Sequence, residues 1–420
     1  MRVLLASPGP AGETDQFLAL GAALRNAGHT ATIIADEQVR FPAKKLGLSF
    51  LPCPADSKIS DWPALQSIAL KTQSRLEEIA CWHSETAPLA PLLLPLVQSQ
   101  IANHDILAFA QEFAYLKNVA RKSGKASAMV VASPLGLPLG GTLPENAGPA
   151  PSWLPRFLLP WWERKDWHAD EKKFDDAVNQ AVGSFLLKSG MGKFSGFFAD
   201  PADVACVAVS PTLFPPQGGL PQKYVQTGFF DCPFPLDDSA NDAIARVRKI
   251  EQTGAPLPVV VLQNAPVAEQ GDAFAKLLGQ WPRGAPLVVQ SERSNLAADP
   301  SRPEVLVVGA LPMEELFTHA SVVVHGGDAR STTAALRAGR PQVIHPQNAT
   351  QRWWASTVQN LGVANILNAA HWQTALRPAL ETTLCDVPML RRVVECCSRV
   401  RSENGCAAAV RELEKLAATS

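Results

Sequence analysis

Two loops in the sequence place residues that could carry acid–base chemistry or bind an anion directly after short apolar runs. The first loop, residues 7–15, contains Gly9, Gly12 and two carboxylates, Glu13 and Asp15. Carboxylates in such a loop are candidates for proton transfer. Since a carboxylate at a helix start is more often a cap or a dipole partner, Asp15 keeps that second interpretation, and Glu13 is the preferred base.

The second loop, residues 325–333, reads HGGDARSTT. It follows an apolar run and opens a predicted helix, so backbone N–H groups, the helix dipole and the hydroxyls of Ser331 and Thr332 would converge on one anion. His325 and Arg330 add cationic donors, and a diphosphate fits this chemistry. Two glycines also permit a tight turn without any ligand, and the Gly-Lys-Ser/Thr sequence of a Walker loop is missing.

Parallel sheets would position these loops, because short β-rich runs alternate with helical patterns in two series. In the first series we expect strands at residues 3–6, 30–35, 48–52, 128–132 and 204–209. In the second we expect strands at residues 259–262, 287–290, 305–308, 322–324 and 342–344. The pattern predicts two doubly wound α/β lobes, with a ligand site in a cleft between them.

Composition narrows the function classes. The chain has 420 residues, a formal net charge of -1, 18% charged residues and 35 prolines. This balance disfavours a polyanion partner such as nucleic acid, and the hydrophobic content of 46% disfavours a disordered chain. The longest apolar run, residues 87–97, is about half of a membrane span. Eight cysteines without metal-ligand spacing predict free thiols and no metal site, and we expect a cytoplasmic protein.

One stretch, residues 149–168, concentrates tryptophan, leucine and proline, and its prolines are expected to interrupt any long helix. It is either a small additional core under a loop or a wall of an apolar acceptor pocket. In the second interpretation the pocket residues are Gly12, Trp153, Phe157, Trp161 and Trp162.

The opening segment MRVLLASPGPAGETDQFLALGAALRNAGHTATIIADEQVR and the later VLVVGALPMEELFTHASVVVHGGDARSTTAALRAGRPQVIHPQNATQRWWASTVQNLGVA resemble the two lobes of a GT-B glycosyltransferase. The likeness, to glycosyltransferases of the family 1 and 28 type, is strongest with the bacterial antibiotic glycosyltransferases and the rhamnosyltransferase of rhamnolipid synthesis. Residues 204–230 and 270–272 are similar to the rhamnolipid branch. Residues 55–200 match poorly.

The resemblance implies roles for individual residues. The family's catalytic base corresponds to Glu13, and its diphosphate-binding histidine corresponds to His325. The donor would then be a UDP- or dTDP-sugar. Its sugar would contact Thr350 and Gln351, and its nucleobase the backbone around Leu311 and Pro312. Its diphosphate would contact His325, Gly327, Arg330, Ser331, Thr332 and Asn264. No bound cofactor or metal is implied.

Three departures from the family pattern lie on the donor side. Asp328-Ala329-Arg330 replaces a glycine-containing segment, so Arg330 either binds phosphate or blocks it. Thr350 replaces an aspartate that would bind sugar hydroxyls, and Asn264-Ala265 replaces a Gly-Ser turn.

We therefore predict an inverting, metal-independent transfer of a hexose or deoxyhexose to a hydroxyl of a hydrophobic small molecule or lipid. The alternative is a GT-B protein with a degenerate donor site that serves as an auxiliary or binding partner. Peripheral membrane contact is compatible with a lipid acceptor. The expected organisation is an acceptor lobe at 1–215, a connection at 216–257, a nucleotide-sugar lobe at 258–400 and a returning helix at 401–420.

Overall fold

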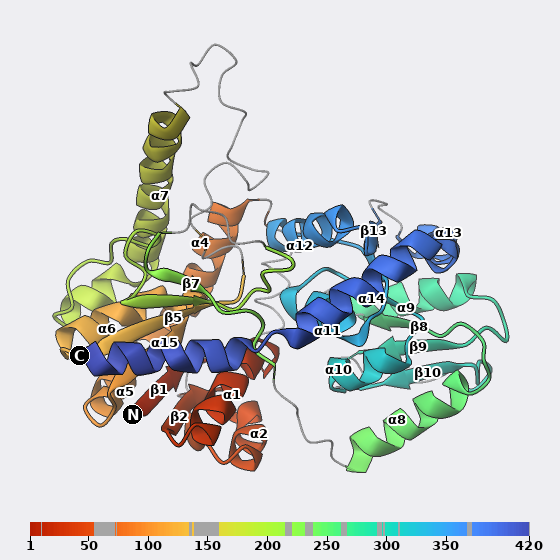
Figure 1. Ribbon diagram of the computed structural model, residues 1–420, viewed down its shortest axis with the longest axis horizontal. Coiled ribbons are helices and arrows are strands. Elements are labelled where there is room, and N and C mark those ends of the chain that lie inside the picture. The colour runs from red at the N-terminus through yellow and green to blue at the C-terminus, as the bar shows by residue number, and fades with distance from the viewer. Residues whose placement is uncertain are drawn as a thin grey trace. The chain divides into compact units, whose positions relative to one another are not determined.

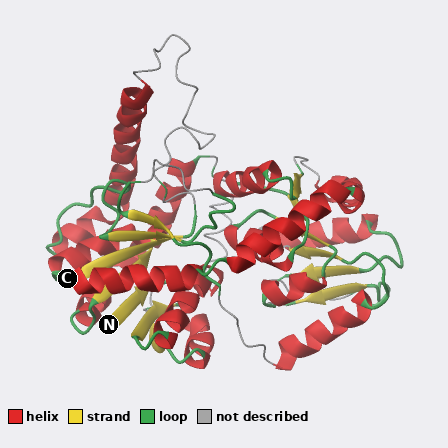
Figure 2. Ribbon diagram, in the orientation of Figure 1, coloured by secondary structure: helices red, strands yellow, loops and turns green. Residues whose placement is uncertain are grey.

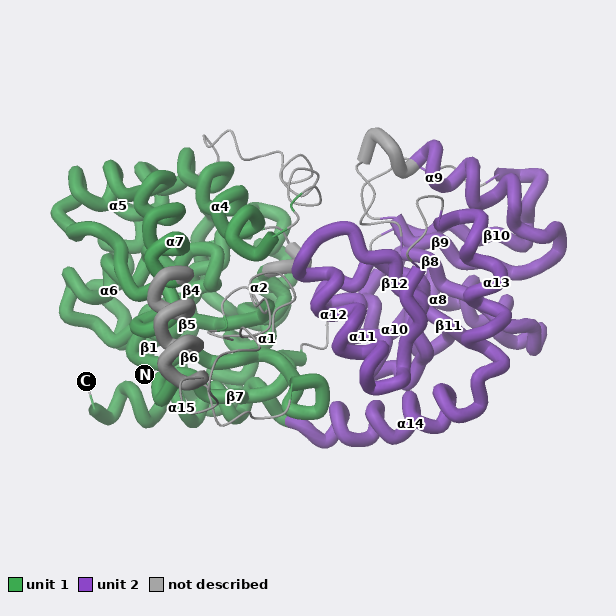
Figure 3. The backbone as a smooth tube through the Cα atoms, turned by 90° about the horizontal axis from the view of Figure 1, so that it is seen from above, with its two compact units in different colours: residues 1–65, 72–233, 404–420 green, residues 66–71, 234–403 purple. Residues whose placement is uncertain are grey.

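The computed structural model describes residues 1–9, 11–53, 72, 74–133, 137, 159–214, 221–231, 238–261, 267–291, 296, 299–309, 311–367 and 372–419. At residues 11–13, 159–170 and 267–270 the description covers the backbone alone. The chain forms two compact units, coloured separately in Figure 3. The first comprises Met1–Leu65, Thr72–Pro233 and Asn404–Ser420, and the second comprises Gln66–Lys71 and Phe234–Glu403.

The first unit is built on a parallel sheet with seven strands among the described residues, in the order β3-β2-β1-β4-β5-β6-β7 (Figures 1 and 2). Every residue of β4 and β5 is buried, which is typical of parallel strands covered by helices on both faces. The strands are β1 (Arg2–Ala6), β2 (Thr30–Ala35), β3 (Ser49–Pro52), β4 (Ile106–Ala110), β5 (Ala126–Val131), β6 (Val204–Val207) and β7 (Tyr224–Gln226).

Helices and 3-10 turns connect these strands. The described helices are α1 (Ala11–Asn26), α2 (Arg40–Lys45), α4 (Arg75–Thr86), α5 (Ala90–Ile101), α6 (Lys117–Lys122), α7 (Leu159–Lys188) and α15 (Gly405–Thr419), with 3-10 turns at Glu37–Val39, Ala87–Leu89 and Gln111–Leu116. Local sequence explains several of the ends. For example, Ser74 and Glu77 form a capping box at the start of α4, in which each side chain accepts a hydrogen bond from the other residue's N–H.

The last helix, α15, belongs to the first unit although it follows the whole second unit in sequence. It packs on α1, β5 and β6. At its start, a Cβ on Gly405 would lie 2.3 Å from the carbonyl oxygens of Gly228 and Phe229, so only glycine allows this approach. Near its end, His29 Nε2 lies 2.8 Å from Glu414 Oε1.

Helix α7 corrects the expectation that prolines interrupt any long helix at residues 149–168. The helix runs for 30 residues from Leu159 through the Trp-rich segment. Pro160 lies in its first turn, where the missing N–H removes no hydrogen bond. Residues 149–158 lie outside the described residues.

The second unit holds a parallel sheet with six strands among the described residues, in the order β10-β9-β8-β11-β12-β13. Its strands are β8 (Pro258–Val261), β9 (Leu287–Gln290), β10 (Val305–Val308), β11 (Val322–His325), β12 (Gln342–Ile344) and β13 (Ala364–Ile366). The helices are α8 (Asp238–Glu251), α9 (Val267–Gln280), α10 (Met313–Leu316), α11 (Ala329–Ala338), α12 (Ala349–Asn360), α13 (Trp372–Cys385) and α14 (Val387–Ser402), with a 3-10 turn at Phe317–His319.

The core of the second unit has two parts on either side of its sheet. Alternate residues of the central strands face opposite sides: Val259 and Val261 pack with α8, α10 and α11, whereas Val260 packs with α9 and α13. The central strands therefore present valines to both faces of the sheet, as the sequence pattern indicated.

Residues 216–257, which were expected to be an interdomain connection, contain a strand and a helix. Strand β7 adds to the edge of the first sheet, and α8 packs its buried Ala240, Ala243, Ile244 and Val247 into the second unit. The Pro- and Gly-rich composition concealed both elements, because a three-residue strand and a charged helix leave weak patterns.

No helix among the described residues is long and apolar enough to cross a membrane. The apolar run at residues 87–97 folds into a 3-10 turn and α5, and its buried residues Leu89, Ala90, Leu93, Leu94 and Val97 join the core. Seven cysteines lie in the described part of the chain, and all seven are free thiols.

Candidate active site

Both sheets reverse their strand order at one point, and the predicted site loops follow strands that flank these points. In the first sheet the reversal lies between β1 and β4, with Ala6 paired to Phe109. In the second it lies between β8 and β11, with Val324 paired to Val260. Crevices for ligands form at the carboxyl ends of the strands at such reversals. The loops after β1 and β11 are therefore at the edges where ligands bind in α/β sheets.

In the first unit, the loop after β1 leads directly into α1. Gly12 and Glu13 lie in the first turn of α1, and the Glu13 side chain is outside the described residues. Asp15 is partly buried one turn further along.

Thr14 was not among the predicted site residues, yet its side chain holds the conformation of this loop. Its side chain is fully buried, and its hydroxyl lies 3.2 Å from the carbonyl oxygen of Ser7 and 3.1 Å from that of Gly9. A single hydroxyl hydrogen is thus shared between two carbonyls of the same loop. Thr14 holds the backbone that carries Glu13, and a threonine between two acidic residues at a helix start was the available signal.

Glu112 is a second carboxyl group at the same sheet edge, and sequence reasoning missed it. It follows β4, the neighbour of β1, and accepts a hydrogen bond from Gln111 Nε2 at 3.1 Å. Burial raises the pKa of the Glu112 carboxyl above its usual value, against the opposing effect of the hydrogen bonds. A carboxyl group with a raised pKa at a ligand-binding edge is suited to proton transfer. The signal was the unrecognised strand ILAFA before Gln-Glu.

In the second unit, the imidazole of His325 is held at the end of β11. Its Nδ1 accepts the N–H of Gly327 at 3.0 Å, so the proton resides on Nε2, which donates to Gln342 Oε1 at 2.8 Å. Burial lowers the pKa of His325, which keeps the ring neutral, although the nearby charge of Asp328 opposes this shift. Both ring nitrogens of His325 have partners inside the protein, and its contact with a diphosphate stays a prediction.

Gly327 is required by the geometry of this turn. Its φ angle is +90°, and a Cβ there would lie 2.8 Å from Ile344 Cγ2 and 3.0 Å from the carbonyl oxygen of Gln351. No other residue fits without movement of the Ile344 side chain and of the α12 backbone at Gln351. His325 and Gly327 together shape the turn that starts α11.

The N-terminus of α11 is the predicted anion site. Asp328 caps it, with Oδ1 accepting the Ser331 N–H at 2.9 Å. Ser331 and Thr332 are fully buried in the first turn, and Arg330 is partly exposed. The predicted diphosphate residues of this loop are thus close together, and the carboxylate of Asp328, one of the departures from the family pattern, lies with them. Asn264, predicted to lie near them, is outside the described residues.

The predicted sugar-binding pair opens α12. Asn348 caps this helix by accepting the Gln351 N–H at 2.9 Å, and Gln351 Oε1 accepts the Gln347 N–H at 2.8 Å. Gln351 is buried, whereas Thr350 is partly buried beside it. Because Ile344 precedes this turn and Gly327 touches Gln351, the starts of α11 and α12 are neighbours.

The predicted nucleobase segment begins at Leu311, after β10. The buried Gln290, at the end of β9, donates from Nε2 to the carbonyl oxygen of Leu311 at 2.9 Å. Pro312 forms the N-cap of α10. This side-chain bridge fixes the backbone of the segment, and a carbonyl oxygen can accept a second hydrogen bond from a ligand.

The predicted acceptor residues are only partly described. Trp153 and Phe157 lie outside the described residues, and Trp161 and Trp162 are described only as backbone within α7. Further along, the second half of α7 packs Phe174 against Phe197 and Phe198, with ring centroids 5.4 and 4.9 Å apart. This aromatic cluster is core.

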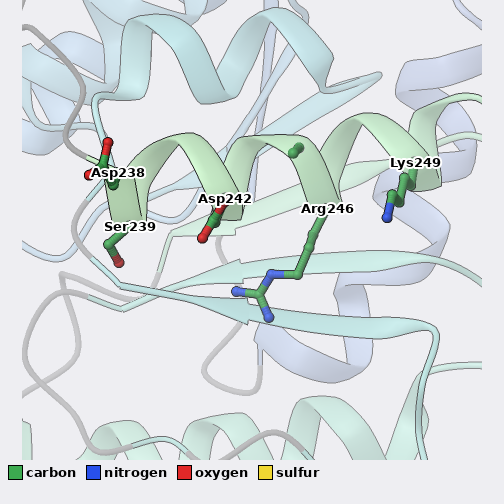
Figure 4. A pocket seen from close by; sticks show the side chains of 6 residues that line it. Asp238, Ser239, Asp242, Arg246 and Lys249 are labelled. Atoms are coloured by element: carbon green, nitrogen blue, oxygen red, sulfur yellow. The ribbon is translucent and has the colours of Figure 1, made fainter.

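A hollow of about 710 Å³ lies along α8, as Figure 4 illustrates. All its lining residues come from this one helix: Asp238, Ser239, Asp242, Ala245, Arg246 and Lys249. A site with converging groups from several elements is what catalysis requires, so this surface is not a candidate active site. Among the described residues no group of three His, Cys, Asp or Glu side chains could hold a metal ion.

Comparison with known proteins connects this geometry to a family. Residues 285–416 match the model of the erythromycin biosynthesis protein CIII-like C-terminal domain. A sterol 3-beta-glucosyltransferase of Debaryomyces hansenii is 22% identical over 96% of this chain, which spans 26% of that relative. The chain spans 8% of the similar enzyme of Neosartorya fischeri, with 34% identity over 114 residues, so it covers only a minor part of these relatives.

Solved structures share the fold of the entire chain. The kitacinnamycin glycotransferase superposes with a TM-score of 0.66 at 17% identity, covering 99% of this chain and 98% of that one. The spinosyn rhamnosyltransferase SpnG, complexed with thymidine diphosphate, superposes with a TM-score of 0.63 at 15% identity, covering 99% of this chain and all of that one (100%). The predicted fold is confirmed: the chain has the GT-B glycosyltransferase fold, residues 285–416 match the erythromycin biosynthesis protein CIII-like C-terminal domain, and the chain is similar to sterol and antibiotic glycosyltransferases.

Proposed function

We propose that the protein transfers a hexose or deoxyhexose, rhamnose-like or glucose-like, from a UDP- or dTDP-sugar to a hydroxyl of a hydrophobic small molecule or lipid. The observation that carries the proposal is the start of α11. There a helix N-terminus with buried hydroxyl side chains follows β11 at the strand-order reversal, inside the segment that matches the erythromycin biosynthesis protein CIII-like C-terminal domain. The thymidine diphosphate complex of the similar spinosyn rhamnosyltransferase SpnG supports a nucleotide donor.

In the proposed reaction, Glu13 takes the proton of the acceptor hydroxyl, with Asp15 as the second choice. The acceptor oxygen forms a bond to the anomeric carbon while the bond from that carbon to the diphosphate oxygen breaks. A single displacement of this kind inverts the configuration at the anomeric carbon. Glu112, whose pKa is raised by burial, is the neighbouring carboxyl group that would exchange protons at the same sheet edge.

The leaving nucleoside diphosphate would be stabilised by the N-terminus of α11, the hydroxyls of Ser331 and Thr332, and Arg330. Asn264 would contribute from the loop after β8. His325 is proposed to contact the diphosphate, and it also holds the Gly327 turn that starts the helix. This arrangement neutralises the charge without a resident metal ion.

The remainder of the donor would lie along the same edge of the second unit. The nucleobase would lie against the backbone of Leu311 and Pro312, which Gln290 fixes, and the sugar against Thr350 and Gln351 at the start of α12. Replacement of the family's aspartate by Thr350 removes an acceptor for sugar hydroxyls, so the donor sugar would differ from that of relatives that keep it.

A hydrophobic acceptor is supported by the names of the relatives, which act in sterol, kitacinnamycin and spinosyn glycosylation. The proposed pocket is Gly12, Trp153, Phe157, Trp161 and Trp162. We further propose a cytoplasmic location with peripheral membrane contact for a lipid acceptor, and no nucleic-acid partner.

A second candidate function is a GT-B protein that binds another enzyme and has lost transferase activity. The observation that favours it is Asp328, a carboxylate at the helix N-terminus where a diphosphate would bind. Calorimetric titration with UDP and dTDP separates the two, because a protein with a degenerate donor site would bind neither.

The direct test is a donor screen with the purified protein. Each UDP- and dTDP-sugar is incubated with a long-chain hydroxylated acceptor and with a sterol, and the products are analysed by mass spectrometry. A mass gain of one hexosyl or deoxyhexosyl group supports the proposal. The absence of any glycosylated product across the screen, together with no binding of UDP or dTDP, would favour the auxiliary function.

A further inference from the structure

Asp328 occupies the position at which an anionic ligand would approach α11. Its Oδ1 accepts the Ser331 N–H at 2.9 Å, and that N–H is one of the few at a helix start that have no partner within the helix. Its other oxygen, Oδ2, is buried and has no hydrogen-bond partner among the described residues. A buried carboxylate oxygen without a hydrogen-bond partner is energetically unfavourable, so little energy is needed to move the Asp328 carboxylate out of this position.

A second feature of the same turn points to a ligand. The side chain of Thr332 is fully buried, and its hydroxyl has no hydrogen-bond partner in the described part of the chain. Buried hydroxyls are almost always paired. The first turn of α11 therefore combines an unsatisfied donor group with an internal carboxylate that holds a neighbouring N–H.

Capping by a side chain is ordinary elsewhere in this unit. Asn348 caps α12, and Asp386 caps α14 by accepting the Met389 N–H at 2.9 Å. Asp328 differs from Asp386 in location, because α11 follows the strand at the reversal of the sheet, beside the buried His325. The aspartate cap of α11 thus lies at a ligand-binding edge, whereas the aspartate cap of α14 lies away from it.

We propose that Asp328 is an internal competitor of the donor diphosphate, and that its carboxylate must leave the Ser331 N–H when a nucleotide binds. The proposal rests on the proposed function, since it concerns the same diphosphate site. The carboxylate and the diphosphate are both anions that use the same N–H groups and the same helix dipole. Asp328 consequently weakens donor binding. The affinity then depends on how strongly the incoming anion interacts with the N–H groups that Asp328 occupies.

The test compares Asp328→Asn with the unaltered chain. Asparagine is also a good N-cap and has nearly the same size, but it carries no negative charge. Isothermal titration with UDP and with dTDP should give a Kd at least tenfold lower for Asp328→Asn. The difference should narrow when the salt concentration is raised from 50 to 500 mM, because salt screens charge repulsion. Asp386→Asn is the matched control and should leave both Kd values unchanged.

The outcomes separate the inference from the proposed function. If the unaltered chain binds a nucleotide and Asp328→Asn binds it equally or more weakly, the competitor role is wrong while the donor site stands. If 5 mM Mg²⁺ brings the unaltered chain to the affinity of Asp328→Asn, the carboxylate is bridged to the diphosphate and is not displaced, which also overturns the inference. If neither protein binds either nucleotide, the proposed function itself fails.

Discussion

The ammonium group of Lys117 lies 2.6 Å from the carbonyl oxygen of Asp200, in the interior of the first unit. It also donates to the carbonyl oxygens of Ser195 at 2.7 Å and Gly196 at 2.9 Å. One buried cation thus closes the segment that joins α7 to β6. The same segment is held from α7, where Asp175 accepts the N–H groups of Gly196 and Phe197.

Replacement of Lys117 by Met should destabilise the first unit strongly. Three partly buried carbonyl oxygens would lose their donor, and an unpaired buried polar group costs about 1 to 3 kcal/mol. We expect a fall of about 3 kcal/mol or more in the free energy of unfolding, measured by urea denaturation. Lys122→Met is the control, because that exposed ammonium donates to a single carbonyl, of Ser189. Equal losses in both variants would contradict the importance of the buried cation.

His83 should make the protein sensitive to acid. Its ring is fully buried against Tyr115 and Phe197, with neither nitrogen paired among the described residues, and burial lowers its pKa to about 4. Between pH 6.5 and 4 the unfolded chain binds a proton that the folded chain does not, so stability falls as the pH falls. The contribution is about 1.4 kcal/mol per pH unit, or about 3 kcal/mol in total.

The measurement is urea unfolding of the unaltered chain and of His83→Phe between pH 7.5 and 4.5. The phenylalanine ring fills a similar space and cannot be protonated, so the variant should lose less stability over this range. Identical pH dependence of the two proteins would show that His83 is not the group responsible.

Gly327→Ala should damage both stability and nucleotide binding. The substitution requires a left-handed backbone for alanine and forces its Cβ against Ile344 and the Gln351 backbone. Strained backbone of this kind costs about 1 to 3 kcal/mol before any clash is added. Gly254→Ala is the control, since Gly254 also has a positive φ of +75° but nothing within 4 Å of its Cβ position. Thermal melting and titration with dTDP should both separate the two variants, and a Gly327→Ala protein that behaves as Gly254→Ala does would refute the packing argument.

Glu13→Gln should lower the rate of glycosyl transfer by roughly 100- to 10,000-fold, the usual contribution of a general base. Nucleotide affinity should be nearly unchanged, because Glu13 belongs to the first unit and the proposed donor residues belong to the second. Glu112→Gln should instead alter the pH dependence of the rate. Full activity of Glu13→Gln, read from product mass over time, would transfer the role of base to Asp15 or Glu112.

Much of the fold follows from the sequence because parallel strands are continuous apolar runs. Strands β2, β9, β10 and β12 have the predicted bounds. Strands β4 and β13 were not expected from the sequence. These losses mattered for the site, since Glu112 follows β4.

The parts of the candidate site that depend on neighbouring residues in the sequence could be predicted, whereas contacts between distant residues could not. The Gly-Gly turn and the start of α11 were expected, but the partner of His325 is Gln342, 17 residues away on a neighbouring strand. That contact depends on strand order, which the sequence does not specify. The Asp328 cap is local, three residues from Ser331, and a D-x-x-S pattern before an apolar helix face would have revealed it.

Helix α15 has a consequence for how this chain is made. Domains generally fold as they leave the ribosome, with the N-terminal one first. Here the helix that packs on α1, β5 and β6 is synthesised after all of residues 234–403. The first unit therefore cannot be completed until the second has been translated. Until then, the surface that α15 covers stays exposed. Nascent chains that stall within the second unit would expose this surface to chaperones and proteases.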